Sequence, residues 1–349
     1  MKPLRVAQVG TGGFGGCRRD LMRKTGLFEL VAAYDLNPEA LERARVEDGA
    51  EPVGSFEQLL AVPGIEAVVI STGAKFHAEQ VLAALRRGLH VFVEKPLCAT
   101  LDETVELLRV QRETGLVVGV GHQDHAHAAR SLAIKELLDS GRLGQLATVE
   151  TVTAHSGGLV IQPGEWRGDP ERNPGGMLFQ CGCHSIHELM FYFGPIRSVS
   201  AMMRYDVHTT QTADVAHCLL AFESGLIGTL SAYHVTPYRH TLNIYGTEYN
   251  FYYDARCAAY GDTPVSVLQP RHNCQAETHE PFPLPAGGDD AGNLRSFYRA
   301  VREGGEPYPS LRDGARAVLV VFAAETSART GRTVDIGSDT PELRDLLDG

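Results

Sequence analysis

The first 120 or so residues alternate short apolar, often β-branched runs with stretches in which apolar residues recur at helical spacing. The runs predict strands at residues 4–9, 28–34, 67–71, 90–93 and 117–121. The stretches between them predict helices at residues 37–48, 55–60, 76–87 and 101–114, with Gly88 and Gly115 at C-cap positions. Alternating elements of these lengths predict βαβ units. This part is therefore predicted to be α/β, with a doubly wound parallel sheet.

From about residue 145 the pattern changes to longer alternating or β-branched runs. They predict strands at residues 146–154, 199–205, 213–222, 226–235 and 241–246. Helical spacing predicts helices at residues 183–192, 292–302 and 311–330, and the Pro- and Gly-rich residues 281–288 predict a loop. We expect a largely antiparallel sheet of the α+β class here, and two domains, residues 1–124 and 125–349.

Composition narrows the class of protein. Of 349 residues, 43% are hydrophobic and 21% charged, as is typical of a globular chain. The formal net charge of −11 disfavours nucleic acid and anionic membrane surfaces as partners. The apolar stretch 317–324 is far shorter than the roughly 18 residues of a membrane-spanning helix.

The ends of the chain and its cysteines bear on localisation. The N-terminal MKPLRVAQVGTGG lacks the apolar stretch of a secretory signal. Seven scattered cysteines, an odd number, fit thiols in a reducing compartment better than a disulfide framework. We expect a cytoplasmic protein.

Gly10, Gly12 and Gly15 form a GxGxxG pattern directly after the first predicted strand and before a helix predicted to begin near Cys17. In this context the first glycine permits a tight turn, the second lets the backbone approach a pyrophosphate, and the third lets helix pack on strand. A glycine-rich surface turn is the less favoured alternative. We therefore predict a Rossmann fold that binds a dinucleotide.

Asp35 stands at the end of the second predicted strand, 20 residues after Gly15. A carboxylate there can accept hydrogen bonds from the adenosine ribose hydroxyls and would repel a 2′-phosphate. The cofactor is therefore predicted to be NAD. NADP stays possible, because Arg18 and Arg19 lie nearby in the sequence and could meet a phosphate.

A lysine follows another predicted strand. Residues 90–96 read HVFVEKP, so Lys95 emerges at the carboxyl end of a parallel strand, where α/β sheets bind ligands. A solvated pair of Glu94 and Lys95 is the structural alternative.

A second cluster of chemically capable residues lies at 175–187, GGMLFQCGCHSIH, after Trp166 and Arg167. Together with the glycine turn, STGAKFH at 71–77 and EKP at 94–96, it resembles the Gfo/Idh/MocA family, the glucose-fructose oxidoreductase and inositol dehydrogenase group of sugar and cyclitol oxidoreductases. The resemblance covers the whole chain, because it continues in NLRSF at 293–297, in Pro307, Asp313 and Gly314, and in SARTGRTV at 327–334.

The resemblance implies an NAD(P)-binding Rossmann domain and a substrate-binding domain built on an open, mostly antiparallel sheet that forms the contacts of a homodimer or homotetramer. The substrate, a carbohydrate or cyclitol, would bind between the domains. Lys95 would hydrogen-bond the reacting hydroxyl and His184 would act as general base. This is chemically sensible, because a histidine with an ordinary pKa near 6.5 can take a proton at neutral pH and a lysine can stabilise alkoxide charge.

The resemblance also implies two sets of binding residues. The substrate-binding set comprises Lys95, Gln180, His184 and His187. Trp166 and Arg167 are expected to close over the nicotinamide end of the cofactor. The full cofactor-binding set comprises Gly10, Gly12, Gly13, Phe14, Gly15, Asp35, Ser71, Thr72, His77, Glu94, Lys95, His122, Trp166 and Arg167.

The chain departs from the commonest family pattern at two positions. An aspartate usually stands four residues before the histidine and another three residues after it, where this chain has Gln180 and His187. An amide cannot exchange a proton but can orient a hydroxyl. A two-residue acid/base relay is therefore in question, and His184 acts alone or with partial help from His187.

A metal site is the rival interpretation of this cluster. Cys181, Cys183, His184 and His187 are residue types that bind zinc, but no second cysteine pair at metal-site spacing completes the set. His122, His125 and His127 could add ligands; we favour His122 beside the cofactor and the other two in a solvated loop. We predict no metal.

The predicted function is NAD-dependent interconversion of a secondary hydroxyl and a ketone on a sugar, cyclitol or glycoside. One alternative is a lyase or glycosidase that uses transient oxidation by NAD. Another is a nucleotide-binding regulatory protein without catalysis. The sequence leaves the roles of Tyr238, Arg239, His240 and Tyr260 unassigned.

Overall fold

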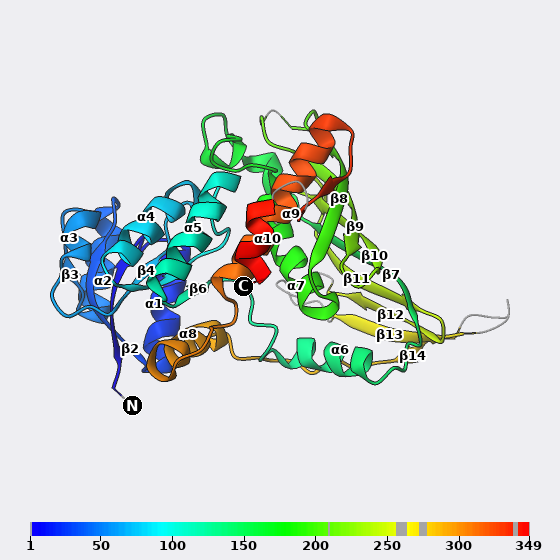
Figure 1. Ribbon diagram of the computed structural model, residues 1–349, viewed down its shortest axis with the longest axis horizontal. Helices are drawn as coiled ribbons and strands as arrows, with labels where there is room; N and C mark the ends of the chain where they lie inside the picture. The colour runs from blue at the N-terminus through cyan, green and yellow to red at the C-terminus, as the bar shows by residue number, and fades with distance from the viewer. Residues whose placement is uncertain (1, 209, 256–263, 272–277, 338–340, 349) are drawn as a thin grey trace. The chain divides into compact units, whose positions relative to one another are not determined.

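The computed structural model describes residues 2–208, 210–255, 264–271, 278–337 and 341–348 (Figure 1). The chain forms two compact units. The first comprises Met1–Asp124, Asp289–Ala315 and Leu346–Gly349, and the second comprises His125–Gly288 and Arg316–Asp345. The expected division at residue 124 differs from this grouping, because Asp289–Ala315 belongs to the first unit.

Six parallel strands form the sheet of the first unit, in the order β3-β2-β1-β4-β5-β6. The strands are β1 (Leu4–Val9), β2 (Phe28–Tyr34), β3 (Glu51–Pro52), β4 (Ala67–Ile70), β5 (His90–Val93) and β6 (Val118–Val120). The helices are α1 (Phe14–Thr25), α2 (Pro38–Asp48), α3 (Phe56–Leu60), α4 (Ala74–Arg86), α5 (Leu101–Thr114) and α8 (Gly292–Glu303). The predicted doubly wound Rossmann sheet is confirmed, and its strand order changes direction between β1 and β4, where such sheets bind ligands.

The first helix begins earlier than the sequence predicts. α1 begins at Phe14, not near Cys17, and its N-cap Gly13 has a φ of 51°. Glycines have low helix propensity, so the glycine-rich residues 12–16 hide the start of the helix in the sequence. Their conformation is set by the turn and by packing.

Helix α8 completes the core of the first unit. Its Leu294, Phe297 and Tyr298 are buried in one cluster with Leu4 and Phe92 of the sheet. The rings of Phe92 and Phe297 meet edge to face with centroids 5.7 Å apart. The apolar face of α8 is visible in the sequence, but local periodicity does not say which unit that face packs against.

The second unit contains a nine-stranded sheet in the order β14-β13-β12-β11-β7-β10-β9-β8-β15. The strands are β7 (Leu146–Ala154), β8 (Ile196–Arg204), β9 (Val215–Phe222), β10 (Ile227–Tyr233), β11 (Arg239–Gly246), β12 (Tyr249–Asp254), β13 (Val265–Pro270), β14 (Glu280–Pro281) and β15 (Val334–Asp335). The helices are α6 (Ala129–Asp139) and α7 (Cys183–Phe193), together with α9 (Leu311–Thr330) and α10 (Pro341–Asp348), which both cross the division between the units along the chain. The expected mostly antiparallel sheet is confirmed.

Two details of this unit differ from the sequence prediction. β7 and β10 pair in parallel, because the chain leaves the sheet after β7 and returns through α7, β8 and β9. The structure also contains α6, β12 and β13, which the sequence analysis did not predict. In β12 the buried Phe251 and Tyr253 alternate with polar neighbours, a period-2 signal that was present in the sequence.

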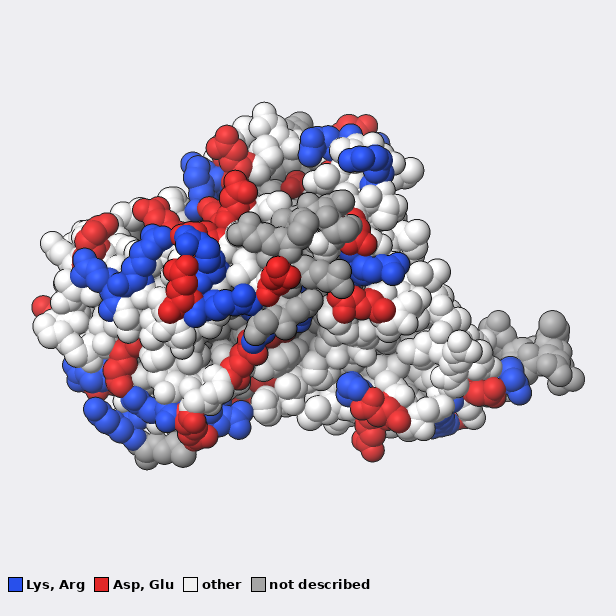
Figure 2. All heavy atoms as spheres, viewed as in Figure 1, with Lys and Arg blue, Asp and Glu red and all other residues white. Residues whose placement is uncertain are grey.

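Surface charge and helix length bear on partners. On the face shown in Figure 2, acidic and basic side chains are interspersed. Over the described residues, every helix is too short or too polar to cross a membrane.

Candidate functional site

The glycine turn joins β1 to α1 and is tightly packed. A Cβ atom on Gly10 would lie 2.5 Å from the carbonyl oxygen of Ser71, and one on Gly15 would lie 2.1 Å from that of Gly10. Side chains at either position would force the turn apart. Buried Gln8 braces it, because its Nε2 donates to the carbonyl oxygens of Gly10 (2.8 Å) and Gly15 (3.0 Å). Sequence reasoning missed Gln8, although a polar residue inside an apolar strand was a signal.

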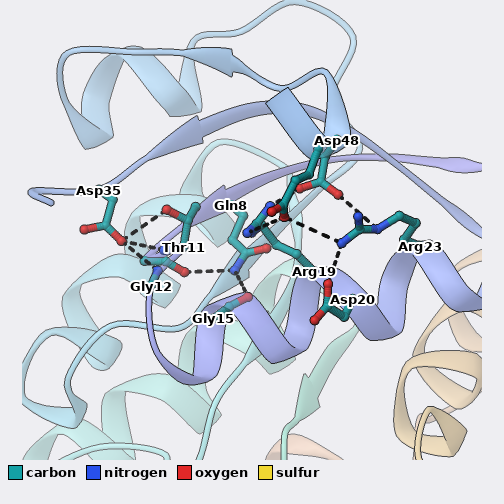
Figure 3. A network of polar contacts seen from close by, with 11 residues as sticks. Gln8, Thr11, Gly12, Gly15, Arg19, Asp20, Arg23, Asp35 and Asp48 are labelled. Carbon is teal, nitrogen blue, oxygen red and sulfur yellow. Dashed lines mark hydrogen bonds and ion pairs between the residues drawn. The ribbon is translucent and has the colours of Figure 1, made fainter. Parts of the chain in front are cut away.

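Asp35 follows β2 and points at the glycine turn (Figure 3). Its Oδ2 accepts hydrogen bonds from the backbone N–H of Thr11 (2.6 Å) and Gly12 (3.1 Å), and its Oδ1 accepts one from Asn37 (2.8 Å). Burial would raise the pKa of Asp35, but these backbone donors outweigh it and hold the pKa below its usual value. The carboxylate is therefore ionised at neutral pH.

The residues around this turn fit a dinucleotide. α1 begins with Phe14, Gly15, Gly16 and Cys17, so its first-turn N–H groups lie beside small or apolar side chains, with no acidic residue in this described turn. A helix N-terminus of this kind binds a pyrophosphate. Asp35 presents the oxygens that a ribose hydroxyl needs.

Arg18 and Arg19 are not available for a 2′-phosphate. Arg18 pairs with Glu94, and Arg19 pairs with Asp48 and Glu47 (Figure 3 shows Arg19 and Asp48). Both arginine side chains are only 3% exposed. The sequence showed that the two arginines are close to the turn, but it did not show that they are buried. Their availability for a 2′-phosphate, which was the reason for keeping NADP possible, is therefore removed.

The loops after β4 and β5 are tied together by His77. Its Nδ1 lies 2.8 Å from the carbonyl oxygen of Pro96 and its Nε2 lies 3.0 Å from that of Thr72. Burial lowers the pKa of His77, so the ring is neutral at pH 7 and donates to one of the two carbonyls. At 1% exposure, His77 lies beneath these loops and supports them. The N–H of Ser71, directly after β4, donates a hydrogen bond to the carbonyl oxygen of Val9 in β1.

Three predicted residues follow neighbouring strands of the first sheet. Glu94 and Lys95 come directly after β5, and His122 comes two residues after β6. Lys95 is half-buried, whereas Glu94 and His122 are buried. Because β5 and β6 are adjacent and parallel, these residues share the carboxyl edge of the sheet with the glycine turn.

In the second unit, Gln180 lies in a short π-helix (Leu178–Gly182) that runs into α7. π-Helical turns occur frequently at functional sites. Gln180 and His184 are half-buried, whereas His187 is 2% exposed and its ring centroid lies 5.3 Å from that of His125. His125 is therefore a buried residue, not the solvated loop residue that we expected.

Trp166 and Arg167 lie in a 3₁₀ turn (Trp166–Gly168). The Arg167 guanidinium lies 5.2 Å from the centroid of the Trp166 ring, which is 42% exposed. The carbonyl oxygen of Arg167 accepts hydrogen bonds from Asn173 (2.7 Å) and Thr212 (3.1 Å). The backbone of this turn is therefore held in place while the indole stays accessible.

The structure adds polar groups beside these residues that sequence reasoning did not select. Cys181 Sγ lies 3.5 Å from His155 Nε2, and His155 Nδ1 accepts a hydrogen bond from the N–H of Gly157. Fully buried Glu188 pairs with Arg130 (3.2 Å) and His240 (3.6 Å). Burial would raise the pKa of Glu188, but His240 and Arg130 lower it strongly.

The unassigned residues of the second unit fall in three places. Tyr238 is 41% exposed, and Arg239 pairs with Asp254. His240 lies in β11 and faces α7 through Glu188. Tyr260 lies outside the described residues. His240 differs from Tyr238 and Arg239 through its contact with Glu188 of α7, which only the three-dimensional structure reveals.

The residues that we considered as zinc ligands do not form a metal-binding group in the described part of the chain. No group of three or more His, Cys, Asp or Glu side chains there could hold a metal ion. The described cysteines, Cys17, Cys98, Cys181, Cys183 and Cys218, are thiols and not disulfides. Burial raises the pKa of Cys98 and of Cys218 to about 12, so these two are unreactive at neutral pH.

Comparisons with known proteins agree with this geometry. Two curated relatives are 27% identical to the chain: 1,5-anhydro-D-fructose reductase of Ensifer adhaerens, with 90% of this chain and 93% of the relative covered, and scyllo-inositol 2-dehydrogenase (NAD(+)) of Bacillus subtilis (strain 168), with 95% and 96% covered. A crystal structure described as an NADPH-dependent oxidoreductase from Desulfitobacterium hafniense superimposes with a TM-score of 0.89 at 26% identity, covering 97% of this chain and 99% of that one.

Two family models match consecutive parts of the chain. Residues 4–122 match the model of an oxidoreductase family with an NAD-binding Rossmann fold, and residues 131–251 match the GFO/IDH/MocA C-terminal domain. The six-stranded parallel sheet of the first unit is the Rossmann fold that the first model describes. The chain therefore belongs to the Gfo/Idh/MocA family of NAD(P)-dependent oxidoreductases.

Proposed function

We propose that this oxidoreductase interconverts a secondary hydroxyl and a ketone on a sugar, cyclitol or glycoside, with NAD as its cofactor. The observation that carries the proposal is the half-buried Lys95 directly after β5, on the same sheet edge as the glycine turn and Asp35. The names of the two curated relatives, a reductase of an anhydro sugar and a dehydrogenase of an inositol, support this class of substrate.

NAD, when bound, supplies a hydride acceptor at its nicotinamide ring. The Nζ of Lys95 donates a hydrogen bond to the reacting hydroxyl oxygen and stabilises the negative charge that develops there. His184 takes the hydroxyl proton as general base. The Gln180 amide orients the substrate, and buried His187 supports α7, the helix that carries His184. Lys95 belongs to the first unit and His184 to the second, so the proposal assigns both units to one reaction.

The assigned cofactor residues divide by what their contacts allow. Gly10, Gly12, Gly13, Phe14 and Gly15 form the pyrophosphate turn with the first turn of α1. Asp35 binds the adenosine ribose, which favours NAD over NADP. Ser71, Thr72, His77, Glu94 and His122 shape the nicotinamide end, and Trp166 and Arg167 cover it.

The second unit is proposed to bind substrate and to form the contacts of a homodimer or homotetramer. Sedimentation velocity of the full chain tests the assembly, and a monomer at micromolar concentration would contradict it. A cytoplasmic location stays a prediction that fractionation of the source cells can check.

The proposal is tested by following NADH absorbance with NAD or NADP against a panel of sugars, inositols and glycosides, with product analysis alongside. Steady NADH formation with one substrate supports the proposal. Substrate loss without net NADH would instead indicate a lyase or glycosidase that oxidises and re-reduces its substrate. NADH binding without any turnover would favour a regulatory protein.

A further inference from the structure

Glu94, which is assigned above to the nicotinamide end of the cofactor site, forms a buried ion pair with Arg18, a residue that has no assigned role. Arg18 lies in the second turn of α1, just after the glycine turn, and Glu94 directly precedes Lys95. The Nε and Nη2 atoms of Arg18 lie 2.7 and 2.6 Å from the same Glu94 oxygen, Oε1. The two side chains are 3% and 6% exposed. The pair therefore joins the phosphate-binding helix to the end of the strand before Lys95.

Asn293 connects this pair to two further elements. Asn293 lies in α8, and its Oδ1 accepts a hydrogen bond from Arg18 Nη1 (3.2 Å). Its Nδ2 donates to the backbone carbonyl of His122, just after β6 (2.9 Å). Arg18, Glu94 and Asn293 thus form one network, the Arg18–Glu94–Asn293 network, which holds α1, β5, β6 and α8 together at the carboxyl edge of the sheet.

Stability alone does not account for this network. The second oxygen of Glu94, Oε2, is buried, and no side chain of the described residues donates a hydrogen bond to it. It is packed so closely on Gly121 that a Cβ there would lie 2.6 Å away. Burying a charged pair with one acceptor unsatisfied is unfavourable, and apolar residues of similar volume often stabilise a protein as well or better. The network is therefore weak evidence for stability, and its geometry is the feature that sets it apart.

The network imposes a narrow geometry. The planar guanidinium of Arg18 lies 4.8 Å from the centroid of the Phe92 ring, and Phe92 is the β5 residue two before Glu94. Its Nε and Nη2 bind Glu94 while its Nη1 binds Asn293, so the orientation of the group is fixed by three partners, of which Phe92 and Glu94 lie in or directly after β5 and Asn293 lies in α8. A lysine has one point charge and could not satisfy Glu94 and Asn293 in the same plane.

We propose that Arg18 and Asn293 are positioning residues that act through Glu94 to fix Lys95 and the nicotinamide end of the cofactor site. This inference rests on the proposed function, because Lys95 matters only if the chain transfers a hydride. Neither residue touches substrate. Hydride transfer is sensitive to displacements of about 1 Å in the reacting groups, so loosening the strand end before Lys95 lowers turnover more than it lowers stability.

The test compares Arg18→Lys with Arg19→Lys. The two arginines are adjacent in α1, equally buried and paired with carboxylates, but Arg19 binds Asp48 and Glu47 of α2 and not the strand end. We expect both variants to lower the thermal midpoint by similar amounts. Only Arg18→Lys should raise the NADH dissociation constant, by about threefold to tenfold, and lower kcat about tenfold to hundredfold. NADH binding is followed by fluorescence titration of the full chain.

Asn293→Ala gives a second comparison, because it leaves the Arg18–Glu94 ion pair in place and should shift both quantities in the same direction. If Arg18→Lys fails to fold, Asn293→Ala carries the test, because it removes a partner of Arg18 and changes no residue assigned to the cofactor or substrate. Equal NADH binding and kcat in the Arg18 and Arg19 variants would overturn the proposal. If the wild type binds NADH but turns over no substrate, the proposed function fails, and the NADH titrations still decide the positioning role.

Discussion

At the scale of single residues, Lys95 and His184 owe their proposed roles to partial burial. Each side chain is half-buried, Lys95 at the end of a buried strand and His184 in the first turn of a helix that is otherwise mostly buried. The backbone of such a residue is held firmly, while the end of its side chain can still reach a substrate. The imidazole groups of His77 and His187 are only 1% and 2% exposed. Such buried side chains contact other residues of the protein and support the loops or helix around them.

Replacing Lys95 by alanine should lower kcat by about two to four orders of magnitude, because the developing negative charge would lose the cation that we propose stabilises it. NADH binding should weaken much less than kcat falls, since Lys95 is only one of the residues assigned to the cofactor and the glycine turn and Asp35 are untouched. Steady-state kinetics and NADH titration check both expectations. Lys135→Ala is the control, because Lys135 forms an exposed helical pair with Asp139 in α6. Turnover near normal in Lys95→Ala would remove the catalytic assignment, and His184→Ala should show a loss of similar size.

Asp35→Asn should weaken NADH binding about tenfold and narrow the preference for NADH over NADPH. An asparagine can accept from Thr11 and Gly12 with its oxygen, but its NH₂ then faces the N–H of Asn37, which now binds a carboxylate oxygen. Because the pKa of Asp35 lies below its usual value, wild-type binding of NADH should lose this carboxylate's contribution only below about pH 4. Dissociation constants for both nucleotides at neutral pH provide the test. An unchanged ratio would contradict the role of Asp35 in cofactor choice.

At the scale of secondary-structure elements, α8 shows how a late segment completes an early fold. Arg302 in α8 binds both carboxylate oxygens of Glu66, at 2.6 and 3.1 Å, just before β4. The N–H of Arg5 in β1 donates to the same carboxylate. Together with buried Phe297 and Tyr298, these contacts attach α8 to the first sheet. The sequence-based division at residue 124 instead placed this helix in the second domain.

Glu66→Gln should lower the free energy of unfolding by about 1 kcal/mol at pH 7. The hydrogen bonds from Arg302 lower the pKa of Glu66 from 4.5 to about 2. A depressed folded-state pKa adds stability above the unfolded value of 4.5 and loses it as the pH falls toward 2. The difference between wild type and variant in urea unfolding should therefore shrink below pH 4.5. Glu29→Gln is the control: it changes an exposed pair with Arg5 and should change the free energy of unfolding by less than about 0.5 kcal/mol. If the difference between wild type and Glu66→Gln stayed constant across the pH range, the link between the pKa of Glu66 and stability would be refuted.

The elements that the sequence predicts well are those whose signal is local. β1, β2, β5, α5, β7 and α9 begin and end where periodicity and caps place them. α1 begins earlier than predicted because glycines hide its start, and the parallel pairing of β10 with β7 follows from connectivity, which periodicity does not report. The glycine turn, Asp35 and Lys95 could be found because each stands at a strand end. Asn293 and Glu188 could not be assigned, because their partners Arg18 and Arg130 lie 275 and 58 residues away. Gln8 has partners only two and seven residues away, so its polar side chain inside an apolar strand could have identified it.

At the scale of the whole molecule, the chain leaves the first unit after Asp124 and returns to it at Asp289. The returning segment brings Asn293 to the carboxyl edge of the first sheet and Phe297 to its core. The cofactor-binding unit is therefore completed only after the larger segment of the second unit, His125–Gly288, has been made. NADH binding should consequently depend on residues near position 300 as much as on those near position 10.

Calorimetry of the full chain should show two unfolding transitions, one for each unit, and the NADH-sensitive one should require α8. NADH at about 100 times its dissociation constant should stabilise that transition by about 2.7 kcal/mol. Phe297→Ala, which empties a fully buried position beside Phe92, should destabilise the same transition by about 3–5 kcal/mol. Ile244→Ala, at a fully buried position of β11, should destabilise the other transition. If Phe297→Ala lowered the transition that NADH leaves unchanged, or if both units always unfolded together, α8 would not be a part of an independently stable cofactor-binding unit.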